Sequence, residues 1–241
     1  MQDKIDCPVC AGHSFSHRFT KQGEDFVLCD GCGLLLINPR PEMTAVEQTY
    51  DSDYSGHYIR KADKKLKRCK KWVARVKNRF QSTGRWLDVG CSAGFVVAAA
   101  DQAGFDAYGV ELEPAAVKYA QIELGLANVR AGTLEAQAYP DHHFDVISMY
   151  DVIEHVPDLN AVVAELKRII KPGGVIEIRT PDVGHWQTPK NLCEWKEVKP
   201  SEHLYYFDVK TLVRLFDNHG LVLKKRRFML KPALDLFFSP S

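Results

Sequence analysis

One segment of the sequence carries the residues expected of a nucleotide-binding turn. Residues 87–95 read LDVGCSAGF, where an apolar strand ends at Asp88 and a turn containing Gly90 and Gly94 leads into a helical run. Glycine lets the backbone approach a ligand closely, and the first N–H groups of a helix are free to bind one. Glu111 ends the next apolar strand, at the spacing expected of a carboxylate that binds a ribose. Together these features predict an adenosine-containing cofactor.

The turn does not fit a dinucleotide. A pyrophosphate site has the pattern G-x-G-x-x-G, whereas Ser92 stands between Gly90 and Gly94 here. The segment resembles the first motif of the class I S-adenosylmethionine-dependent methyltransferases, an acid-x-Gly-x-Gly-x-Gly loop, with Ser92 in place of the middle glycine. The resemblance implies that S-adenosylmethionine is the methyl donor and S-adenosylhomocysteine the product.

The resemblance extends in order from about residue 85 to residue 223. It implies that Asp88 and Gly90 hold the methionine end, that Glu111 binds the ribose hydroxyls, and that the turn 132–134 borders the adenine. A fourth strand at 144–151 and a turn at 171–174 before a fifth strand also match the family. The cofactor-binding residues that follow from it are Asp88, Gly90, Cys91, Ser92, Gly94, Glu111, Leu112, Thr133, Leu134, Tyr150 and Asp151.

Two histidines are the candidate catalytic bases. His155 follows the fourth strand and His203 follows a long loop, and imidazole titrates near neutral pH. The stretch 203–207, HLYYF, is similar to one found in small-molecule methyltransferases of the zinc-ribbon type. The resemblance implies O- or C-methylation of a small natural-product, sugar or quinone-like acceptor. A lone histidine is more often a packing residue than a base, so that alternative stands beside the catalytic one.

The N-terminal region predicts a metal site. Its cysteines, Cys7, Cys10, Cys29 and Cys32, form two C-x-x-C pairs. Four thiolates close the coordination shell of a tetrahedral zinc, so the ion would be structural. A unit of this size cannot bury a large apolar core, and metal ligation would replace the missing burial. A redox pair is the alternative.

The remaining sequence predicts an α/β fold. Short apolar strands alternate with helical patterns such as 115–124 and 159–170, as in a parallel sheet with crossover helices. We therefore expect a Rossmann-like, doubly wound, mostly parallel seven-stranded sheet with a small N-terminal zinc ribbon. The predicted units are the ribbon at 1–45, a basic helical connector or cap at 46–82, and the cofactor-binding methyltransferase domain at 83–241. A lid insertion is expected at about 182–203.

Charge is unevenly placed along the chain. The formal net charge is +1, yet Lys or Arg fills eleven positions between 60 and 79, against one acid, Asp63. Such a stripe can dock phosphates, so an RNA methyltransferase that binds RNA through the ribbon and through Lys64, Lys65, Arg68 and Lys71 is one alternative. A solvated helix face is the plain interpretation. A non-catalytic cofactor-binding protein that pairs with a partner through the apolar tail 234–238 is the other functional alternative.

Composition sets the expected surroundings of the chain. Its 241 residues are 45% hydrophobic, and no apolar stretch approaches the length of a membrane helix. The N-terminus has no secretory pattern. We therefore expect a soluble cytoplasmic protein, a monomer or homodimer, with a small-molecule acceptor as its partner and no membrane partner.

Overall fold

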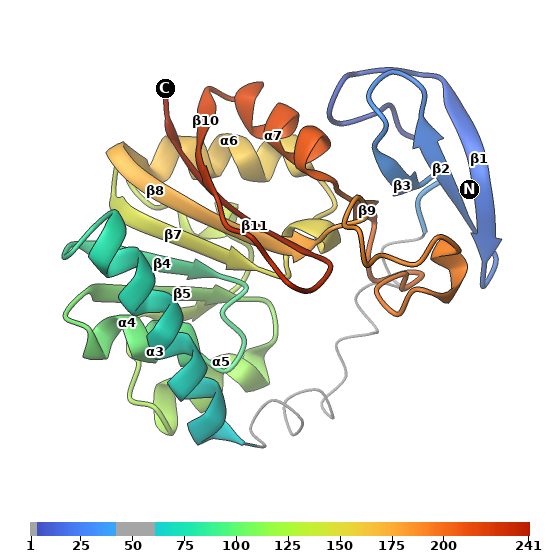
Figure 1. Cartoon of the computed structure of the whole chain (residues 1–241). Coiled ribbons are helices and arrows are strands. Elements are labelled where there is room, and N and C mark those ends of the chain that lie inside the picture. The colour runs from blue at the N-terminus through green and yellow to red at the C-terminus, as the bar shows by residue number, and fades with distance from the viewer. Residues whose placement is uncertain (1–3, 42–60) are drawn as a thin grey trace.

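Two β-sheets organise the chain (Figure 1). The computed structural model describes residues 4–41 and 61–241. The larger sheet has seven strands in the order β10-β11-β8-β7-β4-β5-β6, and the smaller has four in the order β1-β2-β3-β9. The predicted seven-stranded α/β fold is confirmed.

The large sheet is parallel from β6 to β8 and antiparallel at β11 and β10. Strand order reverses between β4 and β7, so the carboxyl ends of these two strands face the crevice where ligands bind in such sheets. The strands are β4 (Arg85–Val89), β5 (Asp106–Glu111), β6 (Val129–Ala131), β7 (Phe144–Tyr150), β8 (Ile170–Pro181), β10 (Leu221–Arg226) and β11 (Ala233–Pro240).

Helices cover both faces of this sheet (Figure 1). α3, α4 and α5 lie on one face, and α6 and α7 lie on the other, because each buries an apolar stripe against the strands. The α-helices are α3 (Ala62–Arg79), α4 (Phe95–Gln102), α5 (Pro114–Ile122), α6 (Leu159–Ile169) and α7 (Val209–Asp217). The short 3-10 helices are η1 (Glu135–Gln137), η2 (Ile153–His155) and η3 (Leu192–Glu194).

The small sheet joins the two ends of the sequence. Its strands β1 (Phe15–Lys21), β2 (Glu24–Cys29) and β3 (Leu35–Ile37) come from the N-terminal region. The fourth strand, β9 (Tyr205–Tyr206), comes from the far side of the predicted lid and pairs antiparallel with β3. The ribbon strands are therefore hydrogen-bonded to a strand from the C-terminal half of the chain (Figure 1).

The apolar tail 234–238 does not have the role predicted for it as a partner-binding segment. Residues 234–238 lie within β11, between β8 and β10, and the Leu236 and Phe238 side chains are fully buried. The tail completes the sheet, so the prediction that it is a docking surface for a partner is wrong.

The loop predicted to be a lid packs partly against the ribbon. Trp195 and Val198 are buried with Phe26 and Ile37, whereas Trp186 is exposed. The predicted turn 171–174 is a bulge in β8, between the pairs Phe144–Ile170 and Val146–Val175. Much of the predicted connector, including Tyr50, Tyr54 and Tyr58, lies outside the described residues.

Candidate functional site

A cavity of about 680 Å³ opens at the carboxyl ends of β4, β5 and β7. Its volume is in the range of small-molecule and cofactor sites. All the predicted cofactor-binding residues line it except Gly94, and His155 lines it as well. Residues that are far apart in the sequence thus share one space.

The glycine turn has the backbone that the motif requires. Gly90 and Gly94 have φ angles of 68° and 79°, which side chains rarely adopt. A Cβ on Gly90 would lie 2.3 Å from Val152 Cγ2, and one on Gly94 would lie 2.8 Å from Leu126 Cδ1. Ser92, where the family has its middle glycine, also has a positive φ of 47°. The turn therefore keeps the glycine geometry with a serine in it.

The Glu111 carboxylate is fixed at the end of β5. It accepts hydrogen bonds from the backbone N–H groups of Ser92 (2.7 Å), Leu112 (2.7 Å) and Glu113 (3.0 Å). These donors hold the carboxylate at the cavity wall, where it can accept further hydrogen bonds from a ribose.

Asp88 is the buried acid of the site. Its side chain is 3% exposed, and Ser148 Oγ donates to Asp88 Oδ1 over 2.5 Å. Trp86 Nε1 in turn donates to Ser148 Oγ over 2.9 Å. Burial raises the pKa of Asp88 to about 7, although the Ser148 hydrogen bond lowers it. A bound cation would restore its charge.

Helix α3 forms the opposite wall. Lys65, Arg68, Cys69 and Trp72 line the cavity from this helix, so part of the basic stripe faces the cofactor space. The Trp72 ring packs edge-on against Tyr150, and the Arg179 guanidinium carbon lies 4.1 Å from the Trp72 ring centre. The sequence predicted a helical connector or cap here but did not identify these side chains as cavity residues, because an alternation of basic and apolar residues is equally typical of a solvated helix.

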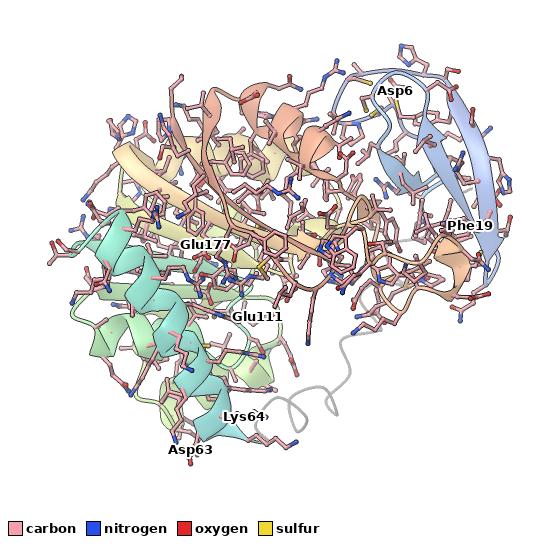
Figure 2. All side chains as sticks on the ribbon, viewed as in Figure 1. Asp6, Phe19, Asp63, Lys64, Glu111 and Glu177 are labelled. Atoms are coloured by element: carbon pink, nitrogen blue, oxygen red, sulfur yellow. The ribbon has the colours of Figure 1, made fainter. Side chains whose placement is uncertain are left out.

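A buried charged network holds α3 against the sheet. Arg179 and Asp235 form an ion pair over 3.0 Å, and Tyr150 donates to Glu177 over 2.5 Å. Arg75 of α3 lies 3.9 Å from Glu177 and 4.0 Å from Asp235. Glu177 and Asp235 have no exposed surface. Figure 2 shows Glu177 beside α3. In the sequence, the signal for this network is the presence of polar residues within otherwise apolar strands.

His155 lines the same cavity as the glycine turn. It ends η2, directly after β7, and its Nδ1 lies 2.8 Å from the carbonyl oxygen of Glu202. A carbonyl only accepts, so Nδ1 carries the proton and Nε2 keeps its lone pair. Burial lowers the pKa of His155, although the hydrogen bond to the Glu202 carbonyl raises it. The imidazole is therefore neutral at neutral pH and able to accept a proton.

His203 contacts the His155 ring and does not itself line the cavity. The two rings are perpendicular, with centres 4.6 Å apart, and His203 is 3% exposed. Burial lowers the pKa of His203 to about 3. Glu154, which is 1% exposed, lies beside the pair and accepts from Thr180 Oγ1 over 2.9 Å. Ligand atoms of these three residues lie within 4.8 Å of one another, a spacing that could also hold a metal ion.

The four ribbon cysteines form a compact cluster. Cys7 Sγ lies 3.5 Å from Cys32 Sγ, Cys10 Sγ lies 3.4 Å from Cys29 Sγ, and all four sulfurs lie within 4.8 Å of one another. Tetrahedral zinc with Zn–S bonds of about 2.3 Å requires sulfurs roughly 3.8 Å apart. The cluster fits such an ion.

Comparison with known proteins agrees with this geometry. The family described as a methyltransferase domain matches residues 57–225. The chain belongs to this methyltransferase family.

Curated relatives of the chain are named ubiquinone biosynthesis O-methyltransferases. That of Bordetella avium (strain 197N) is 33% identical over 114 residues, which cover 45% of this chain and 47% of the relative. That of Bradyrhizobium sp. (strain ORS 278) is 26% identical over 188 residues, or 69% of this chain and 70% of the relative. The chain thus spans about half the length of the first relatives it matches.

Solved structures share the fold. The magnesium protoporphyrin IX methyltransferase of Synechocystis PCC 6803, solved with bound SAH, superposes with a TM-score of 0.64 at 16% identity, covering 83% of this chain and 100% of that one. A TehB-like SAM-dependent methyltransferase from Corynebacterium glutamicum has a TM-score of 0.58 at 15% identity, covering 79% of this chain and 100% of that one.

Among the described residues, no helix has the length and apolar character needed to cross a bilayer.

Proposed function

We propose that the chain transfers a methyl group from S-adenosylmethionine to a hydroxyl oxygen of a small molecule. The observation that carries this proposal is the single cavity that joins Asp88, Gly90 and Glu111 to His155. A cofactor held at the first three residues would lie in the same cavity as the histidine. The relatives named O-methyltransferases support oxygen as the acceptor atom.

Residues of the chain have separate roles in binding the methyl donor. S-adenosylmethionine supplies an activated methyl group when bound, so positioning the acceptor in line with it provides much of the rate acceleration. Glu111 would bind the ribose hydroxyls, and Asp88 would pair with the ammonium group at the methionine end. Arg68, across the cavity on α3, is placed to pair with the methionine carboxylate.

His155 takes the proton of the acceptor hydroxyl. Its Nδ1–H is held by the Glu202 carbonyl, which leaves Nε2 as the accepting atom. A positioned base of this kind contributes on the order of 100- to 10,000-fold to the rate. Of the two predicted bases we assign the role to His155, because His203 is almost fully buried and its pKa of about 3 makes it a weak base. His203 packs against the His155 ring and restricts its rotation.

Release of S-adenosylhomocysteine from S-adenosylmethionine in the presence of hydroxylated aromatic acceptors tests the proposal. We expect at least one catechol or phenol to raise the release rate well above that of the protein alone. The proposal fails if the protein binds S-adenosylhomocysteine but no hydroxylated acceptor raises its release, whereas an amine or a thiol acceptor does.

We also propose that the ribbon binds one structural zinc ion through Cys7, Cys10, Cys29 and Cys32. The sulfur spacing supports tetrahedral coordination, and four thiolates leave no open position for water or substrate. Metal analysis of the purified chain tests this assignment. One zinc per chain is expected, and a metal-free chain with the same fold would contradict it.

An RNA acceptor is the second candidate function. Exposed lysines along α3, at Lys64, Lys67, Lys70 and Lys71, form a positive surface outside the cavity. Contacts to a phosphate backbone make affinity fall steeply with salt. RNA binding that weakens strongly from 50 to 200 mM salt would favour this candidate, and an absence of binding at low salt would remove it.

A further inference from the structure

The ribbon contacts the segment that carries His203 and the carbonyl that holds His155. Leu35 pairs with Tyr206 and Leu36 pairs with Tyr205, so β3 holds β9 along its length. Ile37 N–H donates to the Leu204 carbonyl over 3.1 Å. These bonds lie immediately next to the histidine.

Leu204 connects the ribbon to the candidate base. Its N–H donates to the Glu154 carbonyl over 2.8 Å, next to His155. Its carbonyl accepts from Arg40 Nη1 over 3.0 Å as well as from Ile37. The Arg40 guanidinium carbon lies 4.1 Å from the Tyr205 ring centre. One backbone residue is thus held on one side by the ribbon and on the other by the turn that ends in His155.

A second set of contacts holds the other end of the same segment. Glu24 of β2 accepts from the backbone N–H of Ser201 over 2.8 Å and from its hydroxyl over 2.5 Å. Lys21 Nζ donates to the Val198 carbonyl over 2.7 Å. Glu202, whose carbonyl accepts the hydrogen bond from His155 Nδ1–H, therefore lies between two points that ribbon side chains fix.

We infer that the ribbon is part of the acceptor side of the active site, with Arg40 and Glu24 as residues that position His155. The inference rests on the proposed function for its catalytic meaning. Arg40 and Glu24 fix the segment 201–204, the Glu202 carbonyl fixes the His155 tautomer, and the tautomer presents Nε2 to the acceptor. The glycine turn and Glu111 receive none of these ribbon contacts among the residues that the structure describes, so cofactor binding is expected to be independent of them.

Long-range proton–nitrogen spectra of the histidine-labelled full chain test this inference without an acceptor. The His155 signal is assigned with His155→Gln. In the unsubstituted chain we expect His155 to be protonated at Nδ1 alone. In Arg40→Met we expect a mixture of the two tautomers, because Leu204 loses one of its hydrogen bonds and the neighbouring Glu202 carbonyl is held less firmly. Arg40→Lys, which keeps a donor, should restore the signal in part. Arg18→Met, an exposed change on β1, is the matched control.

The affinity for S-adenosylhomocysteine, measured by calorimetry, should stay within about twofold in each variant. Turnover of the best acceptor in Arg40→Met should fall on the order of 10- to 100-fold, the range expected for a misplaced reacting group. Glu24→Gln provides a second test of the segment if Arg40→Met does not fold.

An unchanged His155 signal in folded Arg40→Met and Glu24→Gln would overturn the inference, as would an equal change in Arg18→Met. Failure of every acceptor to be methylated would contradict the proposed function instead. In that case the histidine spectra would still test whether Arg40 and Glu24 position His155.

Discussion

Asp88 combines burial with a hydrogen bond that favours its charged form. Burial dominates and raises the pKa to about 7, while the Ser148 hydroxyl opposes it. A carboxyl group with such a pKa changes charge within the range of ordinary assays. The site thus has a pH-sensitive group at the place where a cationic ligand is expected.

This pKa predicts the pH dependence of cofactor binding. The ammonium group of S-adenosylhomocysteine favours the carboxylate of Asp88, so a proton must leave Asp88 before binding whenever the pH lies below about 7. Calorimetric affinity should therefore weaken roughly tenfold from pH 8 to pH 6. Asp88→Asn should bind more weakly and lose this dependence. An affinity of the unsubstituted chain that does not change with pH would contradict the assignment.

His155→Gln tests the base. The glutamine keeps a hydrogen-bonding side chain but cannot accept a proton at neutral pH, so kcat should fall about 100-fold or more. Binding of S-adenosylhomocysteine should be unchanged. His203→Gln is the paired variant, and it should reduce kcat less, because His203 contacts the base rather than lining the cavity. A larger decrease of kcat in His203→Gln than in His155→Gln would indicate that His203 is the base instead.

Between β4 and α4, the glycine turn owes its shape to backbone conformation as well as to space. Gly90 and Gly104 both have a positive φ, of 68° and 92°. A Cβ on Gly90 would clash with Val152, whereas a Cβ on Gly104 would have no neighbour within 4 Å. Alanine substitutions at Gly90 and Gly104 therefore distinguish the effect of backbone strain from the effect of a steric clash at the cavity.

Gly90→Ala should therefore abolish measurable binding of S-adenosylhomocysteine, because Val152 and the turn must move apart. Gly104→Ala carries comparable backbone strain away from the cavity, so it should cost some stability and leave binding intact. Thermal unfolding with and without the ligand measures both effects. Equal loss of binding in the two variants would show that strain alone is responsible.

Sequence patterns predicted the elements whose signal is local. The turn at Gly90, the acid at Glu111 and the alternating strands and helices each depend on neighbouring residues, and the structure places them as expected. The pairing of β3 with β9 and the packing of α3 over the cavity depend on residues far apart in the chain. No spacing in the sequence specifies such contacts, which is why the ribbon was predicted only as a separate unit at 1–45.

Across the whole molecule, the ribbon and the methyltransferase half share a sheet and an apolar cluster that includes Phe26, Ile37, Trp195 and Tyr206. A metal that stabilises the ribbon therefore stabilises the acceptor side as well. The cofactor end of the cavity is built from β4, β5 and α3 and does not share that sheet.

Removal of the proposed zinc tests this division. Cys10→Ser should lose the metal and raise amide hydrogen exchange in β1–β3 and β9, because the four thiolates would hold the two C-x-x-C turns of the ribbon together. Exchange in β4 and β5 should change little. Cys193→Ser, a half-buried cysteine outside the cluster, is the control. Increased exchange spread evenly over both sheets would argue against a local role for the metal.

We propose that the cavity lined by the glycine turn and Glu111 binds S-adenosylmethionine and its product. Calorimetric titration of the folded chain with S-adenosylhomocysteine measures this binding. We predict one site per chain, weakened roughly 10- to 100-fold in Glu111→Ala through loss of the ribose hydrogen bonds. No detectable binding, or an affinity that Glu111→Ala leaves unchanged, would contradict the account.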